Sequence, residues 1–181
     1  MATVLFKGNP VALGGAEVNV GDDAPAVTLP SKGLADTQIG GAQEFVQVIV
    51  AVPSLDTPVC ASETRKFNVE ASKIPGVKIF VVSLDLPFAA GRFCTTEGIE
   101  NLEVVSDFRE KAFSNAYGTL INEGVLRGLS ARAIFVIGKD GKVKYKELVS
   151  EITAEPNYDV ALLEAAQANE AKSGCCGGGH C

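Results

Sequence analysis

The stretch that organises this chain is Phe45-Val46-Gln47-Val48-Ile49-Val50-Ala51-Val52-Pro53-Ser54-Leu55-Asp56-Thr57-Pro58-Val59-Cys60. Its first half is rich in β-branched residues and predicts a buried strand. Thr57 is a favoured N-cap and Pro58 a favoured first helical residue, so a helix should begin there with Cys60 at its third position. At that position the unpaired backbone N–H groups and the helix dipole favour thiolate over thiol. The stretch therefore predicts a strand followed by a helix that carries an activated cysteine.

The same cysteine also has a simpler interpretation. Free cysteines are often small core residues, and Cys60 could simply fill space. The expected helix carries Cys60, Thr64, Phe67 and Ala71 at spacings of four, three and four, which makes Cys60 the start of its apolar face. Both interpretations predict a sheltered sulfur, and only the first makes it a nucleophile. A sheltered nucleophile suits a small substrate in a narrow pocket better than a large disulfide.

Length, charge and composition exclude several classes of function. The 181 residues are 46% apolar, which fits one folded domain with a substantial core. The net charge is −6 with no basic cluster and no Trp, so we expect no nucleic-acid binding and no membrane binding. The chain begins without a secretory leader and has no spanning segment, so we expect a cytoplasmic protein. Thiols stay reduced there, so the five cysteines are expected to be catalytic, regulatory or metal-binding.

Strands and helices alternate along much of the chain. Short turns predict a hairpin around residues 7–10 and another around residues 139–141. Two apolar strands with a helix between them and no hairpin turn predict a parallel, right-handed crossover. We therefore expect an α/β fold with a mixed sheet, an antiparallel hairpin edge and helices on both faces. The expected strands are 3–6, 11–13, 27–29, 45–52, 77–84, 102–106, 132–138 and 142–149, and the expected helices are 58–72, 87–97, 109–117 and 158–171.

Two further residues are candidates for the same site. Cys94 lies in the short helix after the second apolar strand, and taken alone it could be another packed thiol. Beside a reactive Cys60 it could condense with a sulfenic acid and form a disulfide. Arg132 begins an apolar strand; such a residue is often simply solvated, but a guanidinium brought to Cys60 would stabilise the thiolate and donate to a peroxide oxygen. Arg65 is expected to point elsewhere, as a surface residue or one behind the site.

Several motifs together are similar to one protein family. Pro53-x-x-x-Thr57-x-x-Cys60 resembles the peroxiredoxin active-site signature, and residues 53–68 as a whole resemble the bacterial thiol peroxidases, which are atypical two-cysteine peroxiredoxins. The resemblance covers about residues 3–168. Four other segments agree with it, and they are Lys7-Gly8-Asn9-Pro10-Val11, Asp85 to Cys94, Ser130-Ala131-Arg132-Ala133 and Glu155-Pro156-Asn157-Tyr158-Asp159.

This resemblance implies a thioredoxin-like fold with an N-terminal β-hairpin, in a homodimer. It implies an antioxidant peroxidase that reduces hydrogen peroxide and alkyl or lipid hydroperoxides and is recycled by thioredoxin, with no metal, haem or flavin cofactor. Cys60 would be the peroxidatic thiolate and Cys94 the resolving cysteine. Thr57 would hold the peroxide, Arg132 would stabilise thiolate and oxyanion, and Pro53 would shield Cys60 from water. Because the two thiols begin on separate helices, the first turn at Cys60 and the helix of Cys94 should unravel in each cycle.

The last nine residues differ from the rest of the chain. The segment 173–181 holds three of the five cysteines and the only histidine, and we expect it to be a flexible tail after a domain spanning residues 1–172. Three interpretations are open: a zinc or copper site, an auxiliary thiol relay, or an incidental Gly-rich appendage. Two other functions compete with the peroxidase: a general disulfide oxidoreductase, which lacks its C-x-x-C pair, and a metal-handling protein. The metal candidates are Cys175, Cys176, His180 and Cys181.

Overall fold

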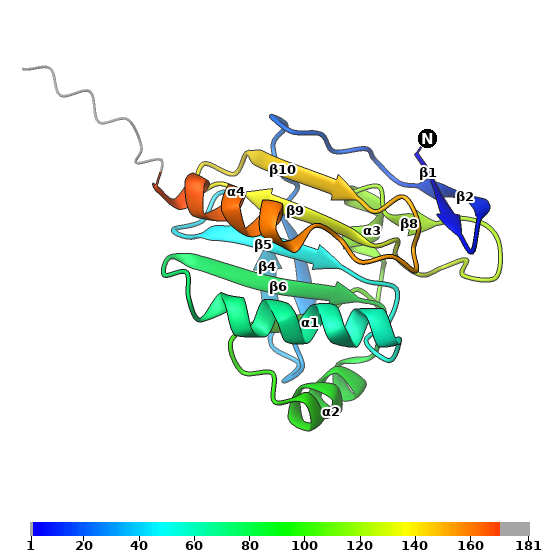
Figure 1. The fold of residues 1–181 in the computed structure, drawn as a ribbon, viewed down its shortest axis with the longest axis horizontal. Coiled ribbons are helices and arrows are strands. Elements are labelled where there is room, and N and C mark those ends of the chain that lie inside the picture. The colour runs from blue at the N-terminus through cyan, green and yellow to red at the C-terminus, as the bar shows by residue number, and fades with distance from the viewer. Residues whose placement is uncertain (1, 171–181) are drawn as a thin grey trace, which may run out of the picture.

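The computed structural model describes residues 2–170, and its centre is one five-stranded sheet (Figure 1). β5 lies in the middle of this sheet, and all of its residues are buried. A strand that is covered on both faces needs apolar residues without alternation, which explains the apolar run in the sequence. The strand order is β10 (Val143–Leu148), β9 (Ala133–Ile137), β5 (Val46–Ala51), β6 (Val77–Ser83) and β7 (Glu103–Ser106).

The sheet is mixed, as the sequence predicts. β5 runs parallel to β6, and β6 runs parallel to β7. Parallel neighbours need a crossover, and the two crossovers here contain α1 (Pro58–Ala71) and α2 (Pro87–Glu97). β9 is antiparallel both to β5 and to β10, and the predicted hairpin joins β9 to β10. The expected parallel core and antiparallel edge are both confirmed.

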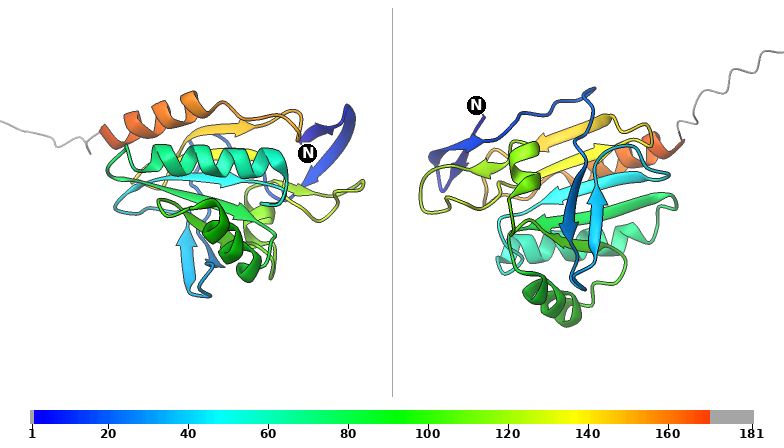
Figure 2. Two further views of the ribbon diagram at one scale, coloured as in Figure 1. Left: turned by 60° about the horizontal axis from the view of Figure 1, so that its bottom comes forward. Right: turned by 180° about the vertical axis from the view of Figure 1, so that it is seen from behind.

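Different elements cover the two faces of the sheet (Figure 2). One face packs against α1, α2 and α4 (Tyr158–Glu170), in a core cluster that includes both Cys60 and Cys94. The other face packs against α3 (Ala112–Ala116) and the hairpin of β3 (Val27–Pro30) and β4 (Asp36–Ile39). The two predicted site cysteines therefore lie on the same side of the sheet.

The predicted N-terminal hairpin is present. β1 (Thr3–Phe6) pairs with β2 (Asn9–Gly14), and β2 also pairs with β8 (Leu120–Ile121). Lys7 and Gly8 both have positive φ, as a two-residue hairpin turn of the I′ type requires. The Glu151 carboxylate accepts hydrogen bonds from both of their N–H groups at 3.0 Å, and bonds of this kind hold its pKa at about 2. This carboxylate ties the hairpin to the segment between β10 and α4.

Three details of the secondary structure differ from the prediction. β4 and β8 were not expected, because neither is long or apolar enough to stand out in the sequence. The helix expected over 109–117 is shorter and begins only at Ala112, since Lys111 adopts a left-handed conformation that ends any continuous helix there. β8 pairs with β2, which is distant in sequence, whereas β4 pairs with the preceding strand β3.

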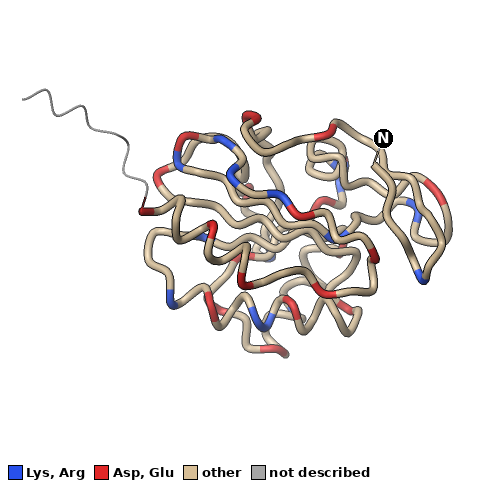
Figure 3. Tube along the Cα trace, turned by 45° about the horizontal axis from the view of Figure 1, so that its top comes forward, with Lys and Arg blue, Asp and Glu red and all other residues tan. Residues whose placement is uncertain are grey.

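Lys and Arg residues are interspersed with Asp and Glu residues along the trace of the described chain (Figure 3). Several pair locally, such as Lys144 with Asp140 in the β9–β10 turn. Within residues 2–170, none of the helices combines the length and the apolar character that crossing a bilayer requires.

Candidate active site

Cys60 and Arg132 come together because of the strand register. β5 and β9 are antiparallel, with Ala51 opposite Ala133. The chain that leaves β5 toward α1 therefore passes the residue just before β9, which is Arg132. The sequence does not reveal this register. It does show that Cys60 follows one predicted strand and that Arg132 begins another.

Cys60 occupies the first turn of α1, as predicted. Thr57 is the N-cap residue and Pro58 follows it, so Cys60 is the third helical residue, and its exposed fraction is 0%. The Thr57 hydroxyl makes no capping bond and instead donates to the carbonyl oxygen of Ser54 at 3.1 Å. The first-turn N–H groups around Cys60 therefore receive no acceptor from the N-cap side chain. Pro53 is buried just before this turn.

Arg132 is held in place by two buried acceptors. Its Nε donates to the carbonyl oxygen of Ile152 at 3.0 Å, and its Nη1 donates to Oε2 of Glu63 at 2.5 Å. The side chains of Arg132 and Glu63 are 2% and 0% exposed, so this is a fully buried ion pair. The guanidinium fork is thereby fixed, with donors left over for a third partner.

The thiol of Cys60 lies close enough to this guanidinium to affect its charge. Burial opposes the charge of Arg132, but attraction and hydrogen bonding to Cys60 and Glu63 outweigh it and raise the pKa of the guanidinium. One buried guanidinium therefore interacts with two acidic groups, the Cys60 thiol and the Glu63 carboxyl. Burial raises the pKa of Glu63 to about 7, although Arg132 acts to lower it. The arrangement keeps a permanent positive charge beside the sulfur.

Glu63 was not singled out from the sequence. It lies one turn after Cys60 on the same helix, and its neighbour Thr64 belongs to the apolar face. The signal that could have identified Glu63 is an acidic residue at the border of the apolar face of a helix, because a buried acid needs a cation as its partner. The sequence alone does not show which cation it meets.

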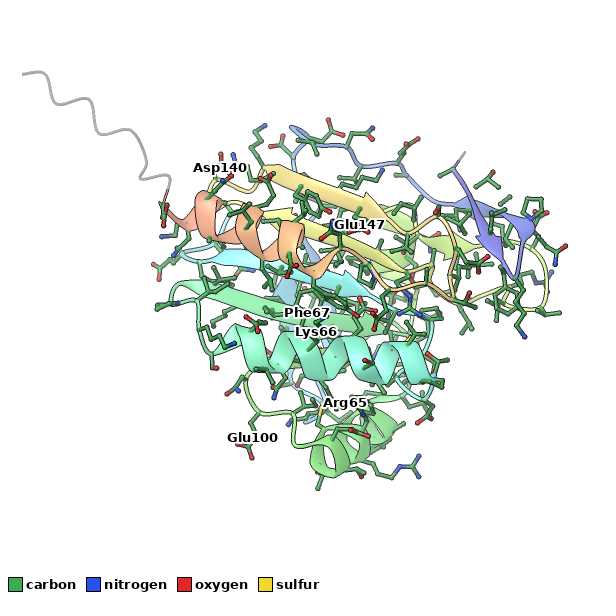
Figure 4. The ribbon with its side chains drawn as sticks, viewed as in Figure 1. Arg65, Lys66, Phe67, Glu100, Asp140 and Glu147 are labelled. Atoms are coloured by element: carbon green, nitrogen blue, oxygen red, sulfur yellow. The ribbon has the colours of Figure 1, made fainter. Side chains whose placement is uncertain are left out.

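The end of α4 nearest the site closes it from that side. The Tyr158 ring packs edge-on against Phe67, with ring centroids 5.4 Å apart, and Lys66 Nζ lies 4.2 Å from the centroid of the same ring. Lys66 and Phe67 are neighbours on α1 (Figure 4). Burial raises the pKa of Tyr158. Among the described residues, Glu63 Oε1 and the Tyr158 hydroxyl are buried without a hydrogen-bond partner. These two unpaired polar atoms show how strongly this corner is shielded from solvent.

The burial of Glu63 predicts an unusual pH dependence of stability. Its pKa is about 7 in the folded protein and about 4.5 when exposed, so the folded state binds the extra proton between these values. The contribution of Glu63 to the free energy of unfolding is therefore fully present below the unfolded pKa and is lost as pH rises toward 7, on the order of 1 kcal/mol per pH unit. Urea unfolding from pH 4.5 to 8 measures this. Glu63→Gln should flatten that part of the curve, and an unchanged slope in the variant would contradict this role for Glu63.

Cys94 lies on α2 and is 3% exposed. Burial raises the pKa of its thiol, and Lys32 offsets this only partly. Both Cys60 and Cys94 are free thiols in this structure. The structure thus places them in one core cluster but on two different helices.

Arg65 lies outside this site, as expected. It faces α2 and forms an ion pair with Glu97 at 2.6 Å, with about half of its side chain exposed (Figure 4). No cluster of three or more His, Cys, Asp or Glu side chains suited to a metal occurs within residues 2–170. The predicted metal candidates Cys175, Cys176, His180 and Cys181 lie outside the described residues.

The chain is similar to known proteins over most of its length. The Redoxin family model matches residues 19–162. A thiol peroxidase of Campylobacter jejuni is 58% identical over 181 residues, covering 100% of this chain and 99% of the relative, and one of Aquifex aeolicus is 55% identical, covering 87% and 92%. The crystal structure of a peroxiredoxin-like protein from Aquifex aeolicus superposes with a TM-score of 0.90 at 51% identity, covering 93% of this chain and 98% of that one.

These matches define the class of protein: the chain belongs to the redoxin family and has its thioredoxin-like fold. Within that family it is a peroxiredoxin, a thiol-dependent peroxidase. The alignment with the Campylobacter jejuni relative extends through residues 173–181, whereas the Aquifex aeolicus relative aligns over 157 residues.

Proposed function

We propose that this peroxidase reduces hydrogen peroxide and alkyl or lipid hydroperoxides through a sulfenic acid on Cys60. The observation that carries the proposal is the burial of Cys60 near the guanidinium of Arg132, which is itself buried and held by Glu63 and Ile152. A buried cation stabilises the thiolate and the oxyanion far more than it would in water. The closed site also favours a small substrate over a protein disulfide.

The first chemical step is an in-line displacement. The Cys60 thiolate attacks the distal oxygen of the hydroperoxide, the S–O bond forms and the O–O bond breaks. The products are sulfenylated Cys60 and an alkoxide, which takes a proton and leaves as the alcohol, or as water from hydrogen peroxide. Arg132 stabilises the charge on the leaving oxygen, and Thr57 holds the peroxide. Pro53 keeps water from the sulfur.

The second step is resolution by Cys94. The Cys94 thiol attacks the sulfenic sulfur, which forms the Cys60–Cys94 disulfide and releases water. Both thiols are buried on separate helices, and a disulfide needs Cα atoms within about 7 Å, so the first turn of α1 and the α2 helix must open. Thioredoxin then reduces the disulfide by thiol exchange.

A single-turnover experiment tests the resolution step. One equivalent of peroxide should convert the wild type to a form whose peptide map contains a linked Cys60–Cys94 pair. Cys94→Ser should react with the first equivalent at an unchanged rate, because Cys94 takes no part in attack, and should accumulate a sulfenic acid that dimedone traps.

A chain shortened by residues 173–181 is the matched control, because it removes the other three cysteines. It should form the same linked pair. A wild type that links Cys60 to a tail cysteine, or forms no linked pair, would refute Cys94 as the resolving partner.

The proposal extends to the setting in which the enzyme works. It has residues 1–172 forming the peroxiredoxin domain, followed by the tail at 173–181, in a homodimer in the cytoplasm. Nucleic acid and anionic membranes are not among its partners in this proposal, because a net charge of −6 with no basic cluster favours neither.

A further inference from the structure

One carboxylate connects the segment before Cys60 to the segment before α2. Asp85 lies between β6 and α2. Its Oδ1 accepts a hydrogen bond from the Ser54 hydroxyl at 2.8 Å, and its Oδ2 accepts one from the Leu55 N–H at 2.7 Å. Its Oδ2 also accepts from the Ser83 hydroxyl at 2.8 Å. This carboxylate thus satisfies three donors from two separate parts of the chain.

The Ser54 end of this network leads directly to the first turn of α1. The Ser54 hydroxyl oxygen accepts from the Asp56 N–H at 3.2 Å, and the Ser54 carbonyl oxygen accepts from the Thr57 hydroxyl at 3.1 Å. Asp85 therefore fixes the turn whose last residue, Thr57, is the N-cap of α1. Any movement of this turn changes where Thr57 and Cys60 lie.

The backbone of Asp85 is also fixed. Its carbonyl oxygen accepts from the Ser106 hydroxyl at the end of β7, and its N–H donates to the Ser83 hydroxyl at 3.3 Å. The anchor of the turn is therefore the sheet itself, through the ends of β6 and β7. Asp85 stands two residues before Pro87, the first residue of the Cys94 helix.

A second set of contacts joins the C-terminal half of α1 to the C-terminal end of α2. There the exposed Arg65–Glu97 ion pair and the Asn68 side chain, which bonds the backbone of Gly98, Glu100 and Asn101, connect the two helices. An exposed ion pair contributes little to stability. The charge-assisted bonds of Asp85 are partly buried and are therefore the stronger connection.

We propose that Asp85 is the positioning residue that sets the balance between the closed state, in which Cys60 reacts with peroxide, and the opened state, in which Cys60 reaches Cys94. This inference rests on the proposed function. While Asp85 holds Ser54 and Leu55, the first turn of α1 stays formed. Release of these bonds frees the turn and the start of α2 together, which is what disulfide formation requires.

The test compares wild type with Asp85→Asn. The amide is neutral and has one oxygen acceptor in place of two, so the donors of Ser54, Leu55 and Ser83 can no longer all be satisfied by charge-assisted bonds. Stopped-flow kinetics should show oxidation of Cys60 slowed about tenfold and conversion of sulfenic acid to disulfide accelerated about tenfold, as expected for one charge-assisted bond. Excess peroxide should then produce less sulfinic acid than in wild type, because the sulfenic acid is removed sooner.

Two controls accompany this variant. Asp140→Asn removes a carboxylate that bonds Lys144 in the β9–β10 turn and should change neither rate. Ser54→Ala removes one bond from the other side of the network, so it should move both rates in the same directions by less, and it tests the inference if Asp85→Asn does not fold.

The outcomes separate the inference from the proposed function. If wild type forms the Cys60–Cys94 disulfide but both steps slow together in both variants, Asp85 has only a structural role and the inference is wrong. Rates within twofold of wild type would overturn it as well. If wild type forms no such disulfide, the resolution step fails first, and the balance assigned to Asp85 fails with it.

Discussion

Replacing Cys60 by serine is expected to abolish peroxide consumption, with a loss of at least about 10³-fold. Thiolate is the nucleophile, and a serine hydroxyl stays protonated even beside a buried guanidinium. The measurement is peroxide consumption with thioredoxin and its reductase as electron donors. The fold should survive, since serine differs from cysteine by one atom and Cys60 forms no disulfide in this structure.

A truncated chain gives this experiment its control. Deletion of residues 173–181 should leave the rate close to that of the full chain, because Cys60, Cys94 and Arg132 are all retained. Activity that persists in Cys60→Ser, or disappears on truncation, would move the chemistry to the tail cysteines. Either result would favour the thiol-relay or metal-handling alternative.

Replacing Arg132 by methionine is expected to give the second largest effect. Methionine fills part of the same buried space without charge, so the thiolate and the leaving oxygen lose their only buried cation among the described residues. Removal of one such stabilising group slows comparable reactions by about 10²–10³-fold. The second-order rate constant of Cys60 with hydrogen peroxide should fall by that amount, as followed by competition with a reference peroxidase.

The same variant should also destabilise the fold, for a separate reason. Without Arg132, the buried Glu63 has no counter-charge, and breaking a buried pair in this way costs about 3–5 kcal/mol. A double variant, Glu63→Gln with Arg132→Met, removes both charges and should recover much of the unfolding free energy. It should not recover the rate. Recovery of the rate in the double variant would show that Arg132 acts only by neutralising Glu63.

The sequence predicted the parts of this protein that depend on local pattern. β-branched runs predicted β5 and β6, and Thr57-Pro58 predicted the start of α1. The helix expected over 87–97 has the bounds of α2, and Gly98 follows its last residue with φ 67°. Turn residues gave both predicted hairpins. Each of these signals lies within a few residues of the feature that it predicts.

Features that depend on distant partners were not predicted. Glu63 is a surface type of residue by composition, and only the register of β9 against β5 turns it into half of a buried ion pair. Asp85 looks like a helix-start residue, and its bonds to Ser54 and Leu55 form only because two loops meet at the same sheet edge. Pairs of side chains that are distant in sequence can be identified only in the structure, because no periodic pattern in the sequence indicates which residues will meet.

Because β9 pairs with β5 in the middle of the sheet, the segment that carries Arg132 opens far less easily than the helix turn that carries Cys60. Arg132 precedes a central strand with neighbours on both sides, so its position persists until the whole sheet melts. The first turn of α1 belongs to a single helix end, where opening is far easier. In the proposed cycle the cation therefore stays in place while the sulfur leaves and returns. When the disulfide is reduced, the first turn of α1 therefore refolds next to an Arg132 whose position has not changed.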